Sequence, residues 1–350
     1  MPGVARTIGT AFALPAAYQA FRMAYFATTV PNTALAKESG RSNWRRGLAY
    51  LGNHTTPYRL AVPGALVAVW AAKWLVEARP GGRLAALVGG PAAAALAHGA
   101  FIVRVGGDFM HGRLLLPATF GLFMVVAALP VEPVGLLLPA ALAVWAVTCG
   151  LRPRLPRHQP ARWRDIVDER AWWQRETGRR HPVTLADYQP VRSTQSGQRA
   201  RQLAAQGADV LVRIDGHEIP LAPGSAVVLE SITIGMGATA AGPDVHVIDV
   251  LGLADAVGSR IAADPHARIG HQKRLPPAWV LARLRLAGTA LPDDVTAADL
   301  QAARQALAHP AVARLLAATR APLTPRRALR NVVQSFGLTR LRITGSATTR

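Results

Sequence analysis

Cysteine and lysine are scarce in this chain of 350 residues. The single cysteine, Cys149, excludes an intramolecular disulfide, and no group of Cys and His has zinc-site spacing. The sequence also lacks a P-loop, a Gly-x-Ser-x-Gly elbow and a Gly-rich dinucleotide turn. These absences argue against P-loop nucleotide hydrolysis, serine-hydrolase chemistry and a Rossmann-type cofactor site.

Acidic residues are outnumbered two to one, with 20 Asp and Glu against 40 Lys and Arg and a net charge of +20. Nucleic-acid-binding proteins gather such cations on one face with aromatic residues between them. Here the arginines are scattered along the chain, so no nucleic-acid partner is expected. Membrane lipid and other anionic phosphate partners fit this charge better.

Apolar residues concentrate before Gly150 and form five segments that meet or approach the length of a membrane span, which is roughly 17 to 25 residues. These segments are 8–26, 60–78, 84–103, 114–129 and 134–151. Because successive spans reverse direction, the polar connections 28–59 and 104–113 must share one side of the membrane with everything after 151. Their Lys and Arg residues alone would place that side in the cytoplasm.

The composition predicts a multi-span α-helical membrane region over 1–151, a Pro/Arg linker over 152–160, a soluble mixed α/β domain over 161–343 and a disordered tail over 344–350. Asp215 and Gly216 separate two β-rich runs and predict a hairpin. Further strands are expected in 225–235 and 245–252. Helices are expected near 163–178, 276–288 and 296–319, the last capped by Thr296.

The connection 104–113 holds Arg104, Asp108, His111 and Arg113. If the segment is helical, Asp108 and His111 at positions i and i+3 share one face and can form an acid–base site. The neighbouring Gly106 and Gly107 would let the backbone approach a ligand. The alternative is a set of solvated charges at the membrane edge, with Arg113 reaching toward head groups.

Two further stretches carry candidate ligand-binding residues. Asn32 and Lys37 follow the first apolar segment, where Lys37 suits a phosphate; the alternative is a solvated turn after the helix end at Pro31. Asp249 and Asp255 follow an expected strand and suit sugar hydroxyls or a divalent cation, although aspartates are also common in turns. His271 and Lys273 belong to a small basic group.

Four motifs in this order resemble one family, the terminal arabinofuranosyltransferases of the actinobacterial cell wall, which are polytopic glycosyltransferases of the GT-C type. The motifs are 30–37, "GGDFMHGRLLLP" at 106–117, "IDVLGLAD" at 248–255 and "RIGHQKRLPPAW" at 268–279. The resemblance extends from about residue 12 to about residue 288. The second and fourth motifs are long and unusual in composition.

The resemblance implies a plasma-membrane enzyme that transfers arabinofuranose from a polyprenyl-phosphate donor to the ends of arabinan. It also implies an extracytoplasmic α/β domain, and this replaces the orientation that charge alone suggested. Asp108 and His111 become catalytic candidates. The substrate-binding candidates are Asn32, Lys37, Arg104, Arg113, Asp249, Asp255, His271 and Lys273. The sequence leaves the role of a divalent metal open.

The sequence departs from the family at one point. Enzymes of this type carry an acidic residue in the first extracytoplasmic loop and have more spans, whereas no acidic residue precedes Lys37 here. We therefore expect a truncated GT-C-like fold, the C-terminal portion of a longer protein. The alternative function is a non-catalytic membrane protein that binds glycan or lipid phosphate.

Overall fold

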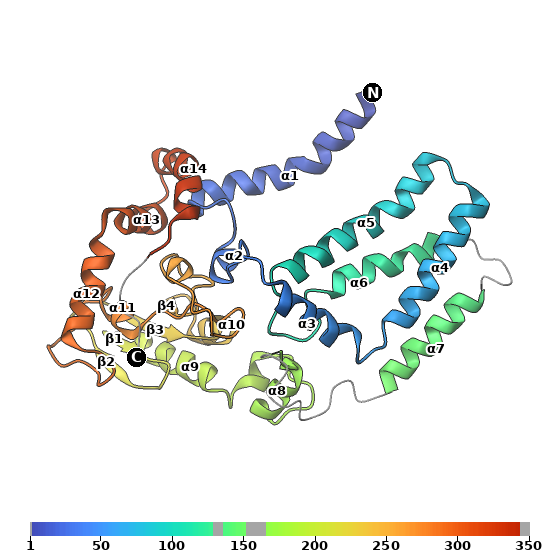
Figure 1. Ribbon diagram of the computed structural model, residues 1–350. Coiled ribbons are helices and arrows are strands. Elements are labelled where there is room, and N and C mark those ends of the chain that lie inside the picture. The colour runs from blue at the N-terminus through green and yellow to red at the C-terminus, as the bar shows by residue number, and fades with distance from the viewer. Residues whose placement is uncertain (1, 129–135, 152–165, 344–350) are drawn as a thin grey trace. The chain divides into compact units, whose positions relative to one another are not determined.

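The computed structural model describes residues 2–128, 136–151 and 166–343, and the chain divides into two compact units (Figure 1). One unit is Ser39–Arg175, and the other combines Met1–Glu38 with Glu176–Arg350. The expected linker 152–160 and tail 344–350 lie outside the described residues. Because contacts do not report the surrounding solvent, the division into a membrane region 1–151 and a soluble domain 161–343 stays a prediction.

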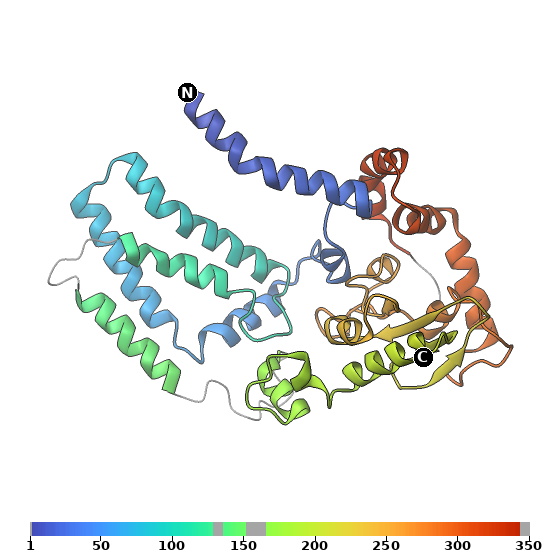
Figure 2. The same cartoon turned by 180° about the vertical axis from the view of Figure 1, so that it is seen from behind.

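Apolar helices form most of the first unit. Its helices are α3 (Trp44–Thr55), α4 (Ala61–Ala78), α5 (Gly82–Arg104), α6 (Leu116–Phe123) with the 3-10 turn η1 (Met124–Ala128), and α7 (Leu137–Leu151). Helices α4 to α7 lie side by side (Figure 1, Figure 2). Val67, Val88, Val125 and Leu138 form the small core between them.

The five expected apolar segments form helices in all their described residues except the turn residues 60, 114 and 115, and the first is α1 (Pro2–Phe26). By length and composition, α4 and α5 are apolar enough to cross a membrane, and only 11% and 22% of their most apolar windows are buried. A core helix of a soluble protein would bury most of such a surface. The number of spans remains a prediction, because α6 and α7 are shorter.

A four-stranded mixed sheet lies at the centre of the second unit. Its strands are β1 (Val210–Val212), β2 (Glu218–Pro220), β3 (Val227–Ser231) and β4 (His246–Asp249), in the order β2-β1-β3-β4. Strand β2 pairs antiparallel with β1, and β1, β3 and β4 are parallel. The mixed α/β domain expected from the sequence is therefore confirmed, as is the hairpin at Asp215-Gly216.

Helices cover both faces of this sheet. The elements of the chain not yet named are α2 (Asn32–Ala36), α8 (Glu169–Thr177, mostly in the first unit), η3 (Leu185–Tyr188), α9 (Arg192–Ala205), α10 (Ile234–Ala241), η4 (Gly258–Arg260), α11 (Pro277–Leu281), α12 (Ala297–Ala308), α13 (Pro310–Arg320) and α14 (Pro325–Arg340). Val210 and Val212 of β1 pack toward α9 and α10. Leu211 packs toward α11, α12 and α13, because successive strand residues point to opposite faces.

Two local expectations were wrong. The expected strand 225–235 ends at Ser231, and Ile234 begins α10, whose small residues allow close packing: a Cβ on Gly237 would lie 2.7 Å from Ser231 Oγ. The helix expected over 276–288 is only Pro277–Leu281. The cap at Thr296 is confirmed, since its side chain accepts a hydrogen bond from the Asp299 backbone N–H.

Candidate functional site

The connection after α5 is a loop whose glycines are required by its backbone. Gly106, Gly107 and Gly112 have φ values of 93°, 71° and 65°, which L side chains rarely adopt. A Cβ on Gly107 would also lie 2.3 Å from the Tyr50 ring. Asp108 and His111 are therefore not on one helical face, and the premise for pairing them was wrong.

One face of α3 holds this loop. Arg46, Tyr50, Asn53 and His54 are all buried and follow one another at helical spacing. Arg46 donates to the carbonyl oxygens of Gly106 and, at 2.9 Å, of Asp108. The downstream part of connection 28–59 thus contacts connection 104–113, as expected if the two share one side.

Tyr50 fixes the middle of the loop from the same face of α3. Its hydroxyl donates to the Met110 carbonyl at 3.0 Å and accepts from the Leu114 N–H at 3.2 Å. Burial raises the pKa of Tyr50 to about 12, so the hydroxyl stays protonated and keeps both contacts. We call Arg46, Tyr50, Asn53, His54 and Tyr58, together with loop residues 106–113, the loop cluster.

Asp108 and Arg113 form an ion pair inside the loop cluster. The Asp108 side chain is 1% exposed, whereas that of Arg113 is 43% exposed. A buried carboxylate therefore holds a guanidinium that reaches solvent. This arrangement suits Asp108 to orienting Arg113 rather than to accepting a proton itself.

The His111 ring is held at both nitrogens. Its Nδ1 lies 2.7 Å from Asn53 Oδ1, which can only accept, and its Nε2 lies 2.9 Å from the Tyr58 hydroxyl. Nδ1 therefore carries the proton, and Tyr58 donates to Nε2. Burial lowers the pKa of His111 and keeps the ring neutral, despite the opposing effect of Asp168. Asn53 is itself 3% exposed.

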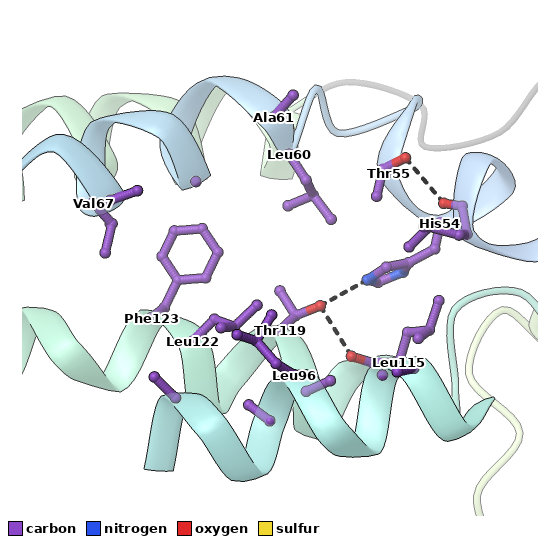
Figure 3. A pocket seen from close by; sticks show the side chains of 18 of the residues that line it. His54, Thr55, Leu60, Ala61, Val67, Leu96, Leu115, Thr119, Leu122 and Phe123 are labelled. Carbon is purple, nitrogen blue, oxygen red and sulfur yellow. Dashed lines mark hydrogen bonds between the residues drawn. The ribbon is translucent and has the colours of Figure 1, made fainter. Parts of the chain in front are cut away.

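An apolar cavity of about 830 Å³ adjoins the loop cluster (Figure 3). Helices α3, α4, α5 and α6 line it, with Leu60, Val67, Leu96, Leu122 and Phe123 among the apolar side chains. At one end, His54 Nε2 lies 2.9 Å from Thr119 Oγ1 (Figure 3). Burial, with a smaller contribution from His111, lowers the pKa of His54 to about 4. The cavity is thus apolar along its length and polar at the end next to the loop.

Arg104 ends α5 and is exposed. Its carbonyl oxygen accepts from the Asn43 N–H at 2.6 Å, which joins the end of α5 to the start of α3. The Arg104 side chain stays a candidate for binding an anion.

A separate cluster in the second unit gathers residues from two other motifs. Asn32 begins α2, and its Oδ1 lies 3.5 Å from Arg260 Nη1. Arg260, 1% exposed, also donates to the carbonyls of Ala256 and Leu338. Lys37 follows the end of α2 and is half-buried. We call α2, Lys37, Glu38, Arg260 and Lys273 the α2 cluster.

Lys273 is the centre of the α2 cluster. Its Nζ donates to the carbonyls of Leu35 at 2.9 Å and Ser259 at 2.8 Å, and it pairs with Glu38 Oε1 at 2.6 Å. These three partners match the three donors of an ammonium group. Burial lowers the pKa of Lys273, although the Glu38 carboxylate opposes that shift. The geometry favours Lys273 as a support for α2 rather than as a ligand for a phosphate.

The two aspartates of motif 248–255 are occupied by protein donors. Asp249, 2% exposed, accepts from the N–H groups of Leu251 and Ala254, and burial raises its pKa. Asp255 pairs with Arg283 at 2.6 Å. Burial works to raise the pKa of Asp255, but Arg283 and backbone donors outweigh it and leave that pKa lowered. Among the described residues, no three Asp, Glu, His or Cys side chains gather as a metal site would require.

His271 lies in a turn and is half-buried, with its backbone N–H bonded to the Arg268 carbonyl at 2.9 Å. It belongs to the same unit as Lys273, and its role as a ligand stays a prediction. Within the second unit, the structure thus brings motif 30–37 together with motif 268–279, through Lys273 and the Leu35 carbonyl.

Sequence reasoning missed the residues of α3 and Tyr58. Arg46, Tyr50, Asn53 and His54 recur at spacings of three and four, and this signal of a buried polar helix face was available. Tyr58 and Arg260 carry no such signal. Tyr58 contacts His111 and Arg260 contacts Leu338, and each partner lies more than 50 residues away in the sequence.

The comparisons with known proteins agree with these motifs. Residues 218–345 match the AftB family C-terminal domain. The matched residues include β4, the turn at Asp255, Lys273 and α14 of the second unit. No solved structure matches the chain.

Two curated relatives are similar to this chain over most of its length. It is 31% identical over 383 aligned residues to a terminal beta-(1->2)-arabinofuranosyltransferase of Mycobacterium tuberculosis (strain H37Rv), covering 94% of this chain and 61% of the relative. It is 31% identical over 366 residues to the protein with the same name from Corynebacterium glutamicum, covering 92% of this chain and 52% of that relative. The chain spans little more than half the length of the curated relatives it matches.

Proposed function

We propose that the chain is a membrane glycosyltransferase, or the C-terminal portion of one. It transfers arabinofuranose from a polyprenyl-phosphate donor to the ends of cell-wall arabinan. The names of the two relatives support the sugar and the reaction class. The observation that carries the proposal is an apolar cavity whose polar end, at His54, adjoins the loop cluster that also holds the fixed, partly exposed Arg113.

The cavity suits the hydrocarbon part of such a donor. Each buried methylene contributes about 0.8 kcal/mol, so a long isoprenoid chain gains affinity from an apolar channel without hydrogen bonds. Leu115, which lies near the end of motif 106–117, lines the cavity together with Val103. A chain lying there would bring its phosphate toward the polar end near His54.

Arg113 is the cation we assign to the donor phosphate. In the transfer, the acceptor hydroxyl oxygen bonds to the anomeric carbon, the bond from that carbon to the phosphate oxygen breaks, and the phosphate leaves with the electron pair. A cation already fixed near that phosphate lowers the barrier without reorganisation. Asp108 supplies this fixation by its ion pair with Arg113.

His111 and Tyr58 are then positioned for the acceptor. Because His111 Nε2 already accepts from Tyr58, the ring is a poor base in this arrangement, but it fixes the direction of the Tyr58 hydroxyl. A fixed hydroxyl can orient a sugar hydroxyl. The acceptor hydroxyl proton passes to the departing phosphate or to water, so no residue of the loop cluster is assigned as its acceptor.

The proposal includes a plasma-membrane, multi-pass location with an extracytoplasmic α/β domain. The two long apolar helices with little buried surface support membrane insertion. The proposed partners are membrane lipid, the lipid-linked donor and the arabinan acceptor.

The test is transfer of labelled arabinofuranose from a polyprenyl-phosphate donor to a short arabinan by vesicles holding the chain. We expect chain-dependent transfer, and Asp108→Asn should reduce turnover about tenfold or more. Asp244→Asn, at an exposed carboxylate, is the matched control and should leave turnover unchanged.

The outcomes separate the two functions considered. Saturable donor binding without any transfer would favour the non-catalytic lipid-phosphate-binding alternative. Normal turnover of Asp108→Asn, with an unchanged unfolding temperature, would remove the Asp108–Arg113 pair from the mechanism.

A further inference from the structure

Helix α14 (Pro325–Arg340) presents an apolar stripe on its exposed face. Leu329, Val333 and Phe336 are 72%, 77% and 59% exposed. Their spacing of four and three residues places them along one side of the helix. In the described part of the chain, no element of the same unit covers this stripe.

The opposite face of α14 is polar and is buried against the end of α1 (Figure 1, Figure 2). Asn331 donates to the Ala24 carbonyl at 2.8 Å, and Arg327 donates to the Tyr25 carbonyl at 3.3 Å. The last carbonyls of a helix have no partner within that helix, so these side chains cap α1. The orientation of α14 is therefore fixed by its polar face, and exposure of the apolar face follows.

Further contacts fix the far end of α14. Thr339 Oγ1 accepts from the Thr29 N–H at 2.9 Å and lies 3.2 Å from Thr28 Oγ1. The helix is thus attached at both ends to the segment that leaves α1. A helix held in this way cannot rotate to bury Leu329, Val333 and Phe336 against its own unit.

The end of α1 that α14 caps is itself aromatic and exposed. Tyr18, Phe21, Tyr25 and Phe26 are each more than 40% exposed, and Arg22 lies 4.8 Å from the centre of the Tyr18 ring. Aromatic residues gather in this way where a membrane helix leaves the hydrocarbon. Their position indicates where the membrane surface would lie relative to α14.

Arginines flank the apolar stripe on the exposed side of α14. Arg326 and Arg330 lie toward its start and Arg340 at its end, and all three are exposed. An apolar strip bordered by cations fits an anionic bilayer surface. It fits a second copy of the same helix less well, because a twofold contact would bring like charges together.

We propose that α14 is an interfacial helix that lies in the head-group region of an anionic leaflet, with Leu329, Val333 and Phe336 toward the acyl chains. The helix fixes the depth and tilt of the α/β domain at the membrane surface through its caps on α1. This inference goes beyond the transfer reaction, and it rests on the proposed membrane location of α1.

The test uses the full chain in vesicles of phosphatidylcholine and phosphatidylglycerol. In a Cys149→Ser background, a polarity-sensitive fluorophore is attached at Val333→Cys, or at Ala302→Cys as the control. Ala302 is an exposed residue of α12 in the same unit. We expect lipid-borne quenchers to act on position 333 about threefold more strongly than on position 302, and aqueous iodide to show the opposite order.

The charge contribution is tested in the same vesicles. Replacing Arg326, Arg330 and Arg340 with Gln should weaken lipid quenching at position 333, and so should vesicles made of phosphatidylcholine alone. Iodide quenching of position 333 equal to that of position 302 would overturn the proposal. Protection of position 333 from iodide that increases with the number of chains per vesicle, together with cross-links between copies, would also overturn the proposal in favour of self-association.

A separate control distinguishes this inference from the proposed function. Extraction of the chain from vesicles by alkaline carbonate would show that α1 is not inserted, and both the membrane location and this inference would then be wrong. A chain that stays inserted but exposes position 333 to iodide would contradict only the role of α14.

Discussion

In the α2 cluster the ammonium group of Lys273 is sealed from solvent, whereas in the loop cluster the guanidinium of Arg113 is 43% exposed. Both cations pair with a carboxylate and both lie in motifs that resemble the family. The two cations differ in where their N–H donors point. The three donors of Lys273 all point to protein oxygens, whereas part of the Arg113 guanidinium faces solvent. Motif membership alone therefore does not separate a structural cation from one that can reach a substrate.

The largest expected effect is on Lys273. Lys273→Met removes the ammonium that lies 2.6 Å from the Glu38 carboxylate, whose side chain is 10% exposed and whose Oε1 also lies 3.9 Å from Arg342 Nε. Removal of one partner of a buried ion pair costs about 3 to 5 kcal/mol. Thermal or denaturant unfolding of the purified chain measures this loss. Lys37→Met, at a half-buried position, is the control and should cost under about 0.5 kcal/mol. Equal costs for the two would contradict the assignment of Lys273 as a support.

Next in size is the contact between α3 and the end of α5 that carries the loop cluster. A Cβ on Gly47 would lie 1.7 Å from the Val103 carbonyl oxygen, so Gly47→Ala must separate two backbones. Overpacking of this kind costs about 1 to 3 kcal/mol. Gly52→Ala in the same helix meets no atom within 4 Å and should be neutral or stabilising by up to about 1 kcal/mol. Unfolding of both variants provides the measurement.

The pH dependence of the loop cluster tests its neutral histidines. The pKa of His54 falls to about 4 in the folded chain, below the unfolded value of 6.5. The folded state therefore binds the proton less well, and stability present above pH 6.5 should be lost as the pH falls toward 4. The full loss is at most about 3 kcal/mol.

Unfolding temperatures measured between pH 7 and pH 4 test this effect. His54→Gln should reduce the fall in unfolding temperature as the pH is lowered. His217→Gln, at a side chain that is 80% exposed, should leave that fall unchanged. An unchanged decline in His54→Gln would show that other groups control the acid sensitivity.

The smallest effect lies outside both clusters and calibrates the others. Thr296→Ala removes the cap of α12 and should cost about 1 kcal/mol. Thr296→Ser keeps the hydroxyl that accepts from the Asp299 N–H and should restore most of that stability. Denaturant unfolding in the same conditions measures both variants, and a cost equal to that of Lys273→Met would undermine the ranking.

Local pattern was enough to predict several elements. Apolar length located the helices now seen as α1, α4, α5, α6 and α7, and turn residues located the β1–β2 hairpin. The helix α10 was mistaken for a strand because Ile232 and Ile234 continue the β-rich run, whereas the small residues that follow pack closely against α9. Propensity near Ile234 was overridden by tertiary packing.

The sequence predicted which residues form the candidate site, but it did not predict which of their side chains contact one another. The sequence placed Asp108, His111 and Arg113 in one short connection, and it assumed a helix there. The positive φ angles of Gly106, Gly107 and Gly112 instead form a loop that brings Asp108 to Arg113 and His111 to Tyr58. Such pairings depend on how α3 packs against the loop, which no local pattern encodes.

The sequence by itself determined which segments are apolar, where the first hairpin of the sheet lies, and which family the motifs resemble. These properties follow from residue type and spacing, which act over a few residues. Only the tertiary structure decided that Lys273 supports α2, that Asp108 holds Arg113 and that the polar face of α14 turns inward. Burial and partner choice depend on residues far apart in the chain, and the folded packing alone brings them together.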